Sequence, residues 1–168
     1  MTTLQEMEDK ALTLAVQCHK GQKDKAGCDY INHPIWVANR CKRLEEKIVA
    51  LLHDTMEDCG VTVEMLREQG FWDNIIDAVH ACTKQKHEDY FDYIRRVGSN
   101  PISRGVKMID LEHNMDILRL AELCQVRMDI RESDLRKGEC CTLSEKDLYR
   151  LNKYLVAHRM LEIMDEND

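Results

Sequence analysis

The sequence predicts a single all-α domain, and three observations support this. Only two prolines and seven glycines occur in 168 residues, so few residues interrupt helices. Apolar residues recur at spacings of three and four along most of the chain, and no stretch shows the alternation of a strand. The hydrophobic content of 43% is sufficient for one core in a chain of this length.

Helices are expected wherever the helical period continues between capping or breaking residues. They cover residues 4–20, 34–44, 46–58, 63–69, 71–82, 88–97, 101–121 and 143–164. Proline at the first position of the second helix leaves His33 at its cap. Thr142 and Glu145 have the spacing of a capping box and open the last helix. The polar stretch 123–141 has no pattern that assigns it.

Composition and charge narrow the range of functions that the sequence allows. The net charge is −7, which argues against a nucleic-acid partner because such proteins usually carry a basic surface. The polar first ten residues are not a signal peptide, and no apolar run approaches the roughly 18 residues of a membrane span. Eight cysteines without a C-x-x-C pair indicate a reducing compartment, so we expect a cytoplasmic protein without a cysteine-bound zinc.

Chemistry is concentrated around an apolar run at residues 48–52. His53 and Asp54 follow it, and Glu57 and Asp58 come four residues after each of them. Residues four apart share a face of a continuous helix, so the four side chains are expected to lie together. Burying such charges is costly unless a cation compensates them.

One metal could be bound by residues from three of the expected helices. The candidate ligands are His33, His53, Asp54 and Asp110, the last of which interrupts the apolar middle of its helix. Two imidazoles and two carboxylates suit Mn²⁺ or Fe²⁺ as well as Zn²⁺, since no thiolate selects zinc.

Three blocks of sequence resemble the motifs of HD-domain phosphohydrolases. They are residues 30–34 (YINHP), residues 50–58 (ALLHDTMED) and residues 106–110 (VKMID) followed by Asn114. The order and spacing are most similar to the hydrolase domain of RelA/SpoT homologues and of small alarmone hydrolases. The resemblance covers about residues 5–160 and implies the all-helical HD fold, as one domain over residues 1–168 with no synthetase or regulatory domain after it.

The resemblance also implies a role for each matching position. His33, His53, Asp54 and Asp110 match the ligands of Mn²⁺, with Fe²⁺ or Zn²⁺ as alternatives. Glu57 and Asp58 match residues of the hydrolytic step, and Lys25, Asn114 and Tyr154 match substrate-binding positions. The implied reaction releases pyrophosphate from the 3′ position of a guanosine polyphosphate such as ppGpp.

The sequence departs from this family in the loop before His33. Asp24 replaces the arginine of an Arg-Lys pair whose lysine, Lys25, is retained, and Asp29 stands where proline is usual. Aspartate does not stack on a base, and two carboxylates near a polyphosphate would repel it. Guanine specificity therefore stays open.

Other functions remain possible from the sequence. The same fold could act on a different nucleotide or phosphoester. A non-enzymatic nucleotide-binding module is a further alternative, against which the intact Glu57 and Asp58 argue. A di-iron oxygenase would need His19 and His113 as additional ligands. The oligomeric state stays open.

Overall fold

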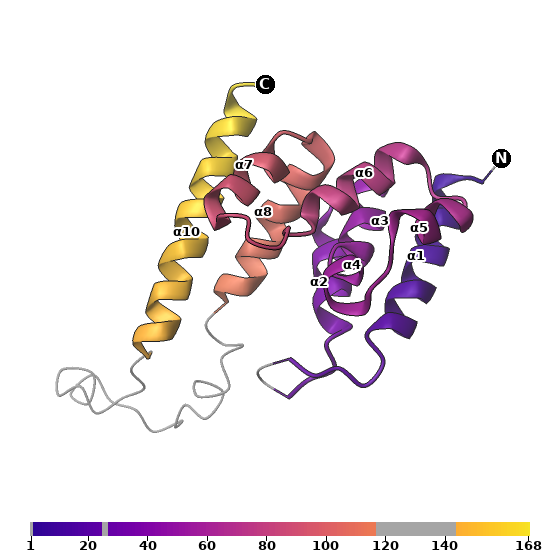
Figure 1. Cartoon of the computed structure of the whole chain (residues 1–168), viewed down its shortest axis with the longest axis horizontal. Coiled ribbons are helices and arrows are strands. Elements are labelled where there is room, and N and C mark those ends of the chain that lie inside the picture. The colour runs from indigo at the N-terminus through magenta and orange to yellow at the C-terminus, as the bar shows by residue number, and fades with distance from the viewer. Residues whose placement is uncertain (1, 25–26, 117–143) are drawn as a thin grey trace.

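The computed structural model describes residues 2–24, 27–116 and 144–168, and within these ranges the regular elements are helices (Figure 1). One isolated bridge joins Lys23 to Asp29. The helices are α1 (Leu4–Cys18), α2 (Asn32–Arg40), α3 (Leu44–Leu52), α4 (Thr55–Cys59), α5 (Val63–Glu68), α6 (Asp73–Cys82), α7 (Tyr90–Gly98), α8 (Pro101–Met115) and α10 (Glu145–Glu166). This confirms the all-α prediction. None of these helices has the length and apolarity that crossing a bilayer requires.

The helix expected over residues 46–58 is in fact two helices, and this changes the geometry of the site. His53 and Asp54 form the corner between α3 and α4. Thr55 Oγ1 donates a 2.7 Å hydrogen bond to the Leu52 carbonyl, and His53 Nδ1 lies 2.7 Å from the Ala50 carbonyl. These side chains compete for carbonyls that a continuous helix would use, which favours the break. The prediction of one continuous helix over residues 46–58, with Glu57 on the face of His53 and Asp58 on that of Asp54, was therefore wrong.

Other helix ends differ by a few residues from the predicted ones. The second helix begins at Asn32, so His33 lies inside its first turn rather than at its cap, and it ends at Arg40. The long helix ends at Met115 with Asp116 as its cap, and residues 117–121 of its predicted span lie outside the described residues. The last helix is capped by Ser144, whose hydroxyl accepts a hydrogen bond from the Asp147 N–H, while Thr142 lies outside the described ranges.

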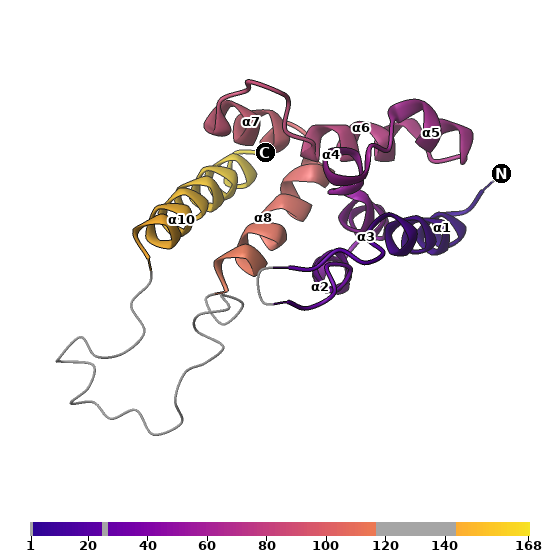
Figure 2. The same ribbon diagram turned by 60° about the horizontal axis from the view of Figure 1, so that its bottom comes forward.

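The larger core surrounds α3. The second half of this helix is apolar on every side, and Ile48, Val49, Ala50 and Leu52 have no exposed surface. It packs against α1, α2, α6 and α8, as the central position of α3 in Figure 2 shows. The corner that follows α3 is therefore anchored in the larger core.

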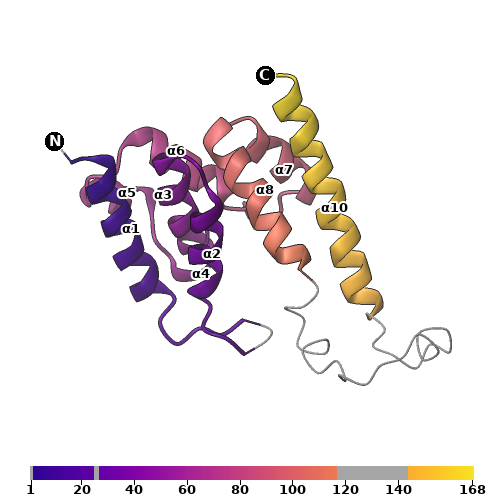
Figure 3. The same cartoon turned by 180° about the vertical axis from the view of Figure 1, so that it is seen from behind.

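A smaller core lies between α7, α8 and α10, on the side away from α1 (Figure 3). Helix α8 belongs to both cores, because Val106 packs in the larger one and Leu111 in the smaller one. Asp110 lies between these two positions, so α8 places it at the boundary of the cores. That residues 1–168 make up one domain remains a prediction.

Candidate metal and active site

The corner between α3 and α4 orients the ring of His53. The ring is 3% exposed, and its Nδ1 lies 2.7 Å from the Ala50 carbonyl. A carbonyl only accepts hydrogen bonds, so Nδ1 carries the proton and Nε2 of the neutral ring has a free lone pair. Nε2 is buried, makes no hydrogen bond, and lies 3.1 Å from Asp54 Oδ2. A nitrogen oriented in this way from behind is typical of a metal ligand.

The predicted ligands His33, on α2, and Asp110, on α8, meet this corner. His33 Nε2 lies 3.0 Å from Asp110 Oδ1 and 3.7 Å from Asp54 Oδ2, and His53 Nε2 lies 3.7 Å from Asp110 Oδ1. Ligands about 2.1 Å from one ion stand about 3.0 Å apart in an octahedron and about 3.4 Å apart in a tetrahedron. The contacts at 3.0 and 3.1 Å match this spacing, and those at 3.7 Å are slightly longer. Among the described residues, His33, His53 and Asp54 form the one group of histidine, cysteine or acidic side chains whose ligand atoms all lie within 4.8 Å of one another, and Asp110 adjoins this group through its contacts with the two histidines.

The electrostatics of the cluster also favour a cation. Burial alone would raise the pKa of Asp110, but the Lys107 ammonium and the two histidines hold that pKa well below its ordinary value. Burial would likewise raise the pKa of Asp54, but His53 lowers it. The pKa of His53 is lowered by burial, yet the two carboxylates raise it well above its ordinary value. Both acids are thus ionised, and a positive charge is favoured between them.

Tyr30 closes one side of the cluster. Its hydroxyl donates a 2.6 Å hydrogen bond to Asp54 Oδ2. Burial and the Asp54 carboxylate raise the pKa of Tyr30, so the phenol keeps its proton and remains a donor. This bond fixes one oxygen of Asp54 relative to the histidines.

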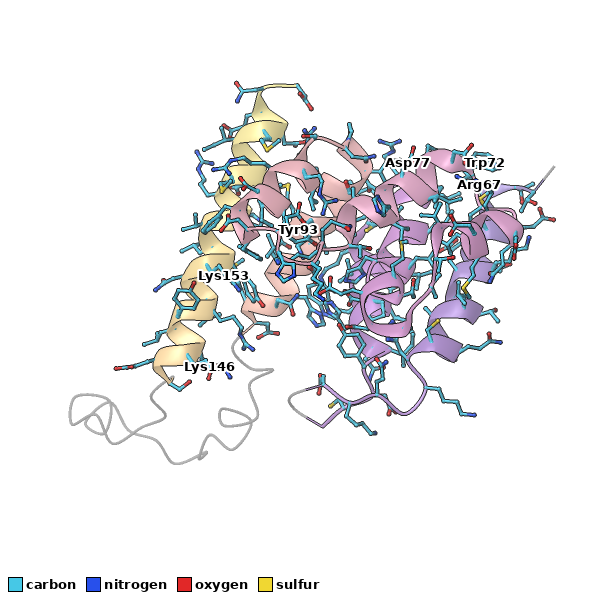
Figure 4. The ribbon with its side chains drawn as sticks, viewed as in Figure 1. Arg67, Trp72, Asp77, Tyr93, Lys146 and Lys153 are labelled. Atoms are coloured by element: carbon cyan, nitrogen blue, oxygen red, sulfur yellow. The ribbon has the colours of Figure 1, made fainter. Side chains whose placement is uncertain are left out.

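A cavity of about 260 Å³ opens beside the cluster. Its lining includes the predicted residues Glu57, Asp58, Asn114 and Tyr154, together with Lys84, Tyr90, Tyr93 and Lys107. The far wall comes from α7 and α10, on which Figure 4 labels Tyr93 and Lys153. The Lys153 ammonium lies 4.4 Å from the centre of the Tyr90 ring. The cavity therefore combines acidic groups on one side with aromatic and basic groups on the other.

The two predicted catalytic acids have different surroundings. Burial, followed by the Asp54 and Glu57 carboxylates, raises the pKa of Asp58. Glu57 Oε2 accepts a 3.2 Å hydrogen bond from the Lys84 main-chain N–H, which ties it to the link between α6 and α7. Asp58 is thus better suited to carry a proton, and Glu57 to hold its position.

The predicted substrate-binding residues fall into three cases. Asn114 lines the cavity and donates a 2.6 Å hydrogen bond to Asp110 Oδ1, so it also orients a predicted ligand. Tyr154 lines the cavity from α10, and burial raises its pKa. Lys25 lies outside the described residues. The roles of these residues remain predictions.

The acids that depart from the family pattern do not point into the cavity. Asp29 pairs with Lys23 at 2.7 Å, and Asp24 Oδ1 accepts a 2.9 Å hydrogen bond from the Cys28 N–H. Neither residue lines the cavity. The expected repulsion of a polyphosphate by these two carboxylates stays a prediction.

Sequence reasoning missed two neighbours of the cluster. Lys107 Nζ lies 2.8 Å from Asp110 Oδ2. Because Lys107 precedes Asp110 by three residues on the same helix, the spacing could have predicted this pair. His113 Nδ1 lies 2.6 Å from His33 Nδ1, on the side of that ring away from the cluster. His113 was considered only as a spare ligand of a second iron, and a contact between two distant histidines leaves no local pattern. His19 Nδ1 lies 2.8 Å from Gln22 Oε1, and among the described residues neither His19 nor His113 belongs to a group of side chains close enough to share an ion.

Comparisons with known proteins agree with the resemblance read from the three blocks. The family model for the HD domain matches residues 11–108. The chain is 34% identical over 123 residues to a probable GTP pyrophosphokinase of Mycobacterium leprae, covering 66% of this chain and 16% of that protein. It is 32% identical over 121 residues to a guanosine-3′,5′-bis(diphosphate) 3′-pyrophosphohydrolase of Aquifex aeolicus, covering 65% and 17% respectively. A protein of the same name from Haemophilus influenzae is 36% identical over 119 residues, covering 62% and 18%.

The chain spans about a sixth of the length of these curated relatives. Their names include both a GTP pyrophosphokinase and a guanosine-3′,5′-bis(diphosphate) 3′-pyrophosphohydrolase, and together with the family match they confirm the prediction of an enzyme. The fold, the grouping of histidines and acids, and the match over more than half of the residues agree with one another. The chain belongs to the HD-domain family.

Proposed function

We propose that this chain is a metal-dependent phosphohydrolase that uses Mn²⁺ to release pyrophosphate from the 3′ position of a guanosine polyphosphate such as ppGpp. The observation that carries the proposal is the spacing of the His33, His53, Asp54 and Asp110 donor atoms beside a cavity that Asp58 also lines. The names of the Aquifex aeolicus and Haemophilus influenzae relatives support the substrate class.

Hydrolysis is favoured over synthesis by what surrounds the cluster. A divalent cation bound there would supply a polarised water and neutralise charge on the phosphoryl oxygens. Asp58, with its raised pKa, can exchange a proton with the attacking water or with the leaving oxygen. Glu57 is held in place by the hydrogen bond that it accepts from the Lys84 N–H.

The rest of the cavity suits a phosphorylated nucleotide. Lys84 supplies a positive charge to its lining, and Tyr90 and Tyr154 supply aromatic surface. We assign no nucleic-acid or membrane partner, and we expect the protein to act in the cytoplasm.

A different nucleotide or phosphoester is the second candidate, and one observation favours it. Asp24 Oδ1 accepts a hydrogen bond from the Cys28 N–H, and a carboxylate cannot stack on a base as the guanidinium of the family pattern would. Substituting Asp24→Arg should raise turnover of ppGpp if this position limits guanine binding. An unchanged rate would argue that the loop does not set the base preference.

The test is a pyrophosphate and phosphate release assay on ppGpp and a panel of nucleotides, with Mn²⁺ or with EDTA. We expect Mn²⁺-dependent release of pyrophosphate from ppGpp, and an unchanged rate in the control His80→Ala, whose side chain is exposed on α6. Turnover of another nucleotide instead would favour the second candidate. If metal-loaded protein left every compound intact, both hydrolase candidates would be contradicted, and a non-enzymatic binding module would be the remaining function.

A further inference from the structure

The ring of His33 is supported from behind by a column of side chains that does not include any predicted ligand. His113 follows His33, Trp36 covers His113, and Arg40 covers Trp36. The Trp36 and His113 rings are 3.9 Å apart with planes within 13°, and the Arg40 guanidinium lies 3.3 Å from the Trp36 ring centre. The column begins at the exposed Arg40 and ends against the buried ring of His33.

The contact between the two histidines is a hydrogen bond in one plane. Their Nδ1 atoms are 2.6 Å apart, their ring centres are 4.9 Å apart, and their planes differ by 7°. Such a bond needs one N–H donor and one unprotonated acceptor. Since His33 Nε2 faces Asp110 and Asp54, a neutral His33 that binds a cation there has its proton on Nδ1. With a cation bound at Nε2, His33 Nδ1 therefore donates, and His113 Nδ1 accepts.

We infer that His113 and Trp36 are positioning residues for the metal site, which fix the tautomer and the orientation of His33. Helix α2 carries His33 and Trp36 one turn apart, and α8 carries Asp110 and His113 one turn apart. The column thus joins the two helices that supply His33 and Asp110 to the cluster. Trp36 lies flat on the His113 ring and prevents it from turning its nitrogen away from His33.

This inference rests on the metal site of the proposed function and adds two residues that touch neither the cation nor the substrate. Removing a hydrogen-bond partner of a ligating histidine typically weakens metal binding by roughly 10- to 100-fold. The same range is expected for loss of the His113 acceptor. Loss of the Trp36 ring, which acts through His113, should have a smaller effect.

The first experiment is equilibrium dialysis of Mn²⁺ against the full chain and four variants. His113→Phe keeps a flat ring without an acceptor, His113→Gln keeps an acceptor, Trp36→Leu removes the stacking surface, and His80→Phe is a matched control on the exposed face of α6. We expect the Mn²⁺ dissociation constant to rise roughly 10- to 100-fold in His113→Phe, to recover most of that loss in His113→Gln, and to stay unchanged in His80→Phe. Wild-type affinity in a folded His113→Phe variant would overturn the inference.

The second measurement does not depend on any variant folding. Nitrogen NMR of the wild-type histidines with the diamagnetic Zn²⁺ bound reports which ring nitrogens carry protons. We expect a protonated Nδ1 in His33 and an unprotonated Nδ1 in His113. The reverse assignment would overturn the inference, whereas a wild-type chain that binds neither metal would instead remove the proposed function.

Discussion

Lys107 Nζ lies 2.8 Å from Asp110 Oδ2, one turn earlier on α8, and the two side chains are 15% and 4% exposed. The ammonium takes one oxygen of the carboxylate, while the other lies 3.0 Å from His33 Nε2. Burial lowers the pKa of Lys107, but the Asp110 charge raises it well above its ordinary value, so the lysine stays charged. Lys107 therefore keeps Asp110 ionised and in place whether or not a metal is bound.

Replacing Lys107 by methionine should destabilise the metal-free protein by roughly 3 kcal/mol, because it leaves a buried carboxylate without its cation. Urea unfolding with and without Mn²⁺ measures this, and added Mn²⁺ should restore more stability to the variant than to the wild type. The double variant Lys107→Met with Asp110→Asn should recover part of the loss without metal. Equal stability of the single variant and the wild type would show that the pair contributes nothing.

Substitutions of the two acids of α4, Asp58 and Glu57, should lower kcat to different extents. Asp58→Asn should lower kcat by roughly 10²- to 10⁴-fold, the range for loss of a general acid or base. Its affinity for Mn²⁺ should change little, since it is not among the predicted ligands. Glu57→Gln should have a smaller effect, because an amide oxygen can still accept the bond from the Lys84 N–H. If the two substitutions had equal effects on kcat, the assignment of the proton to Asp58 would be wrong.

The link between α6 and α7 should lose stability in acid. Arg96 donates to both oxygens of Glu88 at 2.8 Å and to the Thr83 carbonyl at 2.9 Å. The hydrogen bonds from Arg96 lower the pKa of Glu88 to about 2. A carboxyl with a depressed folded pKa stabilises the protein above its unfolded pKa, and this contribution is lost as pH falls from about 4.5 to about 2. The unfolding free energies of the wild type and of Glu88→Gln should therefore converge as the pH falls across this window. A difference that stays constant with pH would show that ionisation of Glu88 does not stabilise the fold.

Gly98 allows α10 to approach α7 closely. A Cβ at this position would come within 2.5 Å of Met164 Sδ and 3.1 Å of Leu161 Cδ2. Gly98→Ala should therefore cost roughly 1–3 kcal/mol of unfolding free energy through overpacking, despite the better helix propensity of alanine.

The matched control is Gly105→Ala on α8, where a Cβ would lie 3.3 Å from the carboxylate of Glu46, an easier neighbour to move. Thermal or urea unfolding of both variants, and of Gly98→Ala combined with Met164→Ala, completes the test. A destabilising effect of Gly98→Ala that Met164→Ala does not relieve at all would show that the strain lies elsewhere.

Much of the fold could be predicted from the sequence because apolar periodicity and chain-breaking residues are local signals. The apolar run before His53 predicted the buried helix α3, and the break at residues 98–101 predicted the start of α8. The corner at His53 and Asp54 could not be predicted, since it depends on side chains that bond to carbonyls within the same turn. Helical spacing alone favours a continuous helix there.

The sequence predicted which residues form the candidate site better than it predicted how they contact one another. The three blocks named His33, His53, Asp54 and Asp110, which the structure brings together. Contacts between residues far apart in the chain leave no pattern in the sequence. His33 and His113 are 80 positions apart, and Glu57 and Lys84, which share a hydrogen bond, are 27 positions apart. In the loop before His33, the charges of Asp24 and Asp29 suggested repulsion of a polyphosphate; the sequence did not reveal the local partners of both side chains, and the repulsion stays a prediction.

Titration of the metal-free wild-type chain with Mn²⁺, followed by the free-ion signal in electron paramagnetic resonance, tests the central claim most directly. The account predicts saturable binding of one ion per chain, which is abolished when His53 or Asp110 is replaced by alanine and kept when His80 is replaced. Binding that the His53→Ala and Asp110→Ala variants retain in full, or no saturable binding by the wild type, would contradict it.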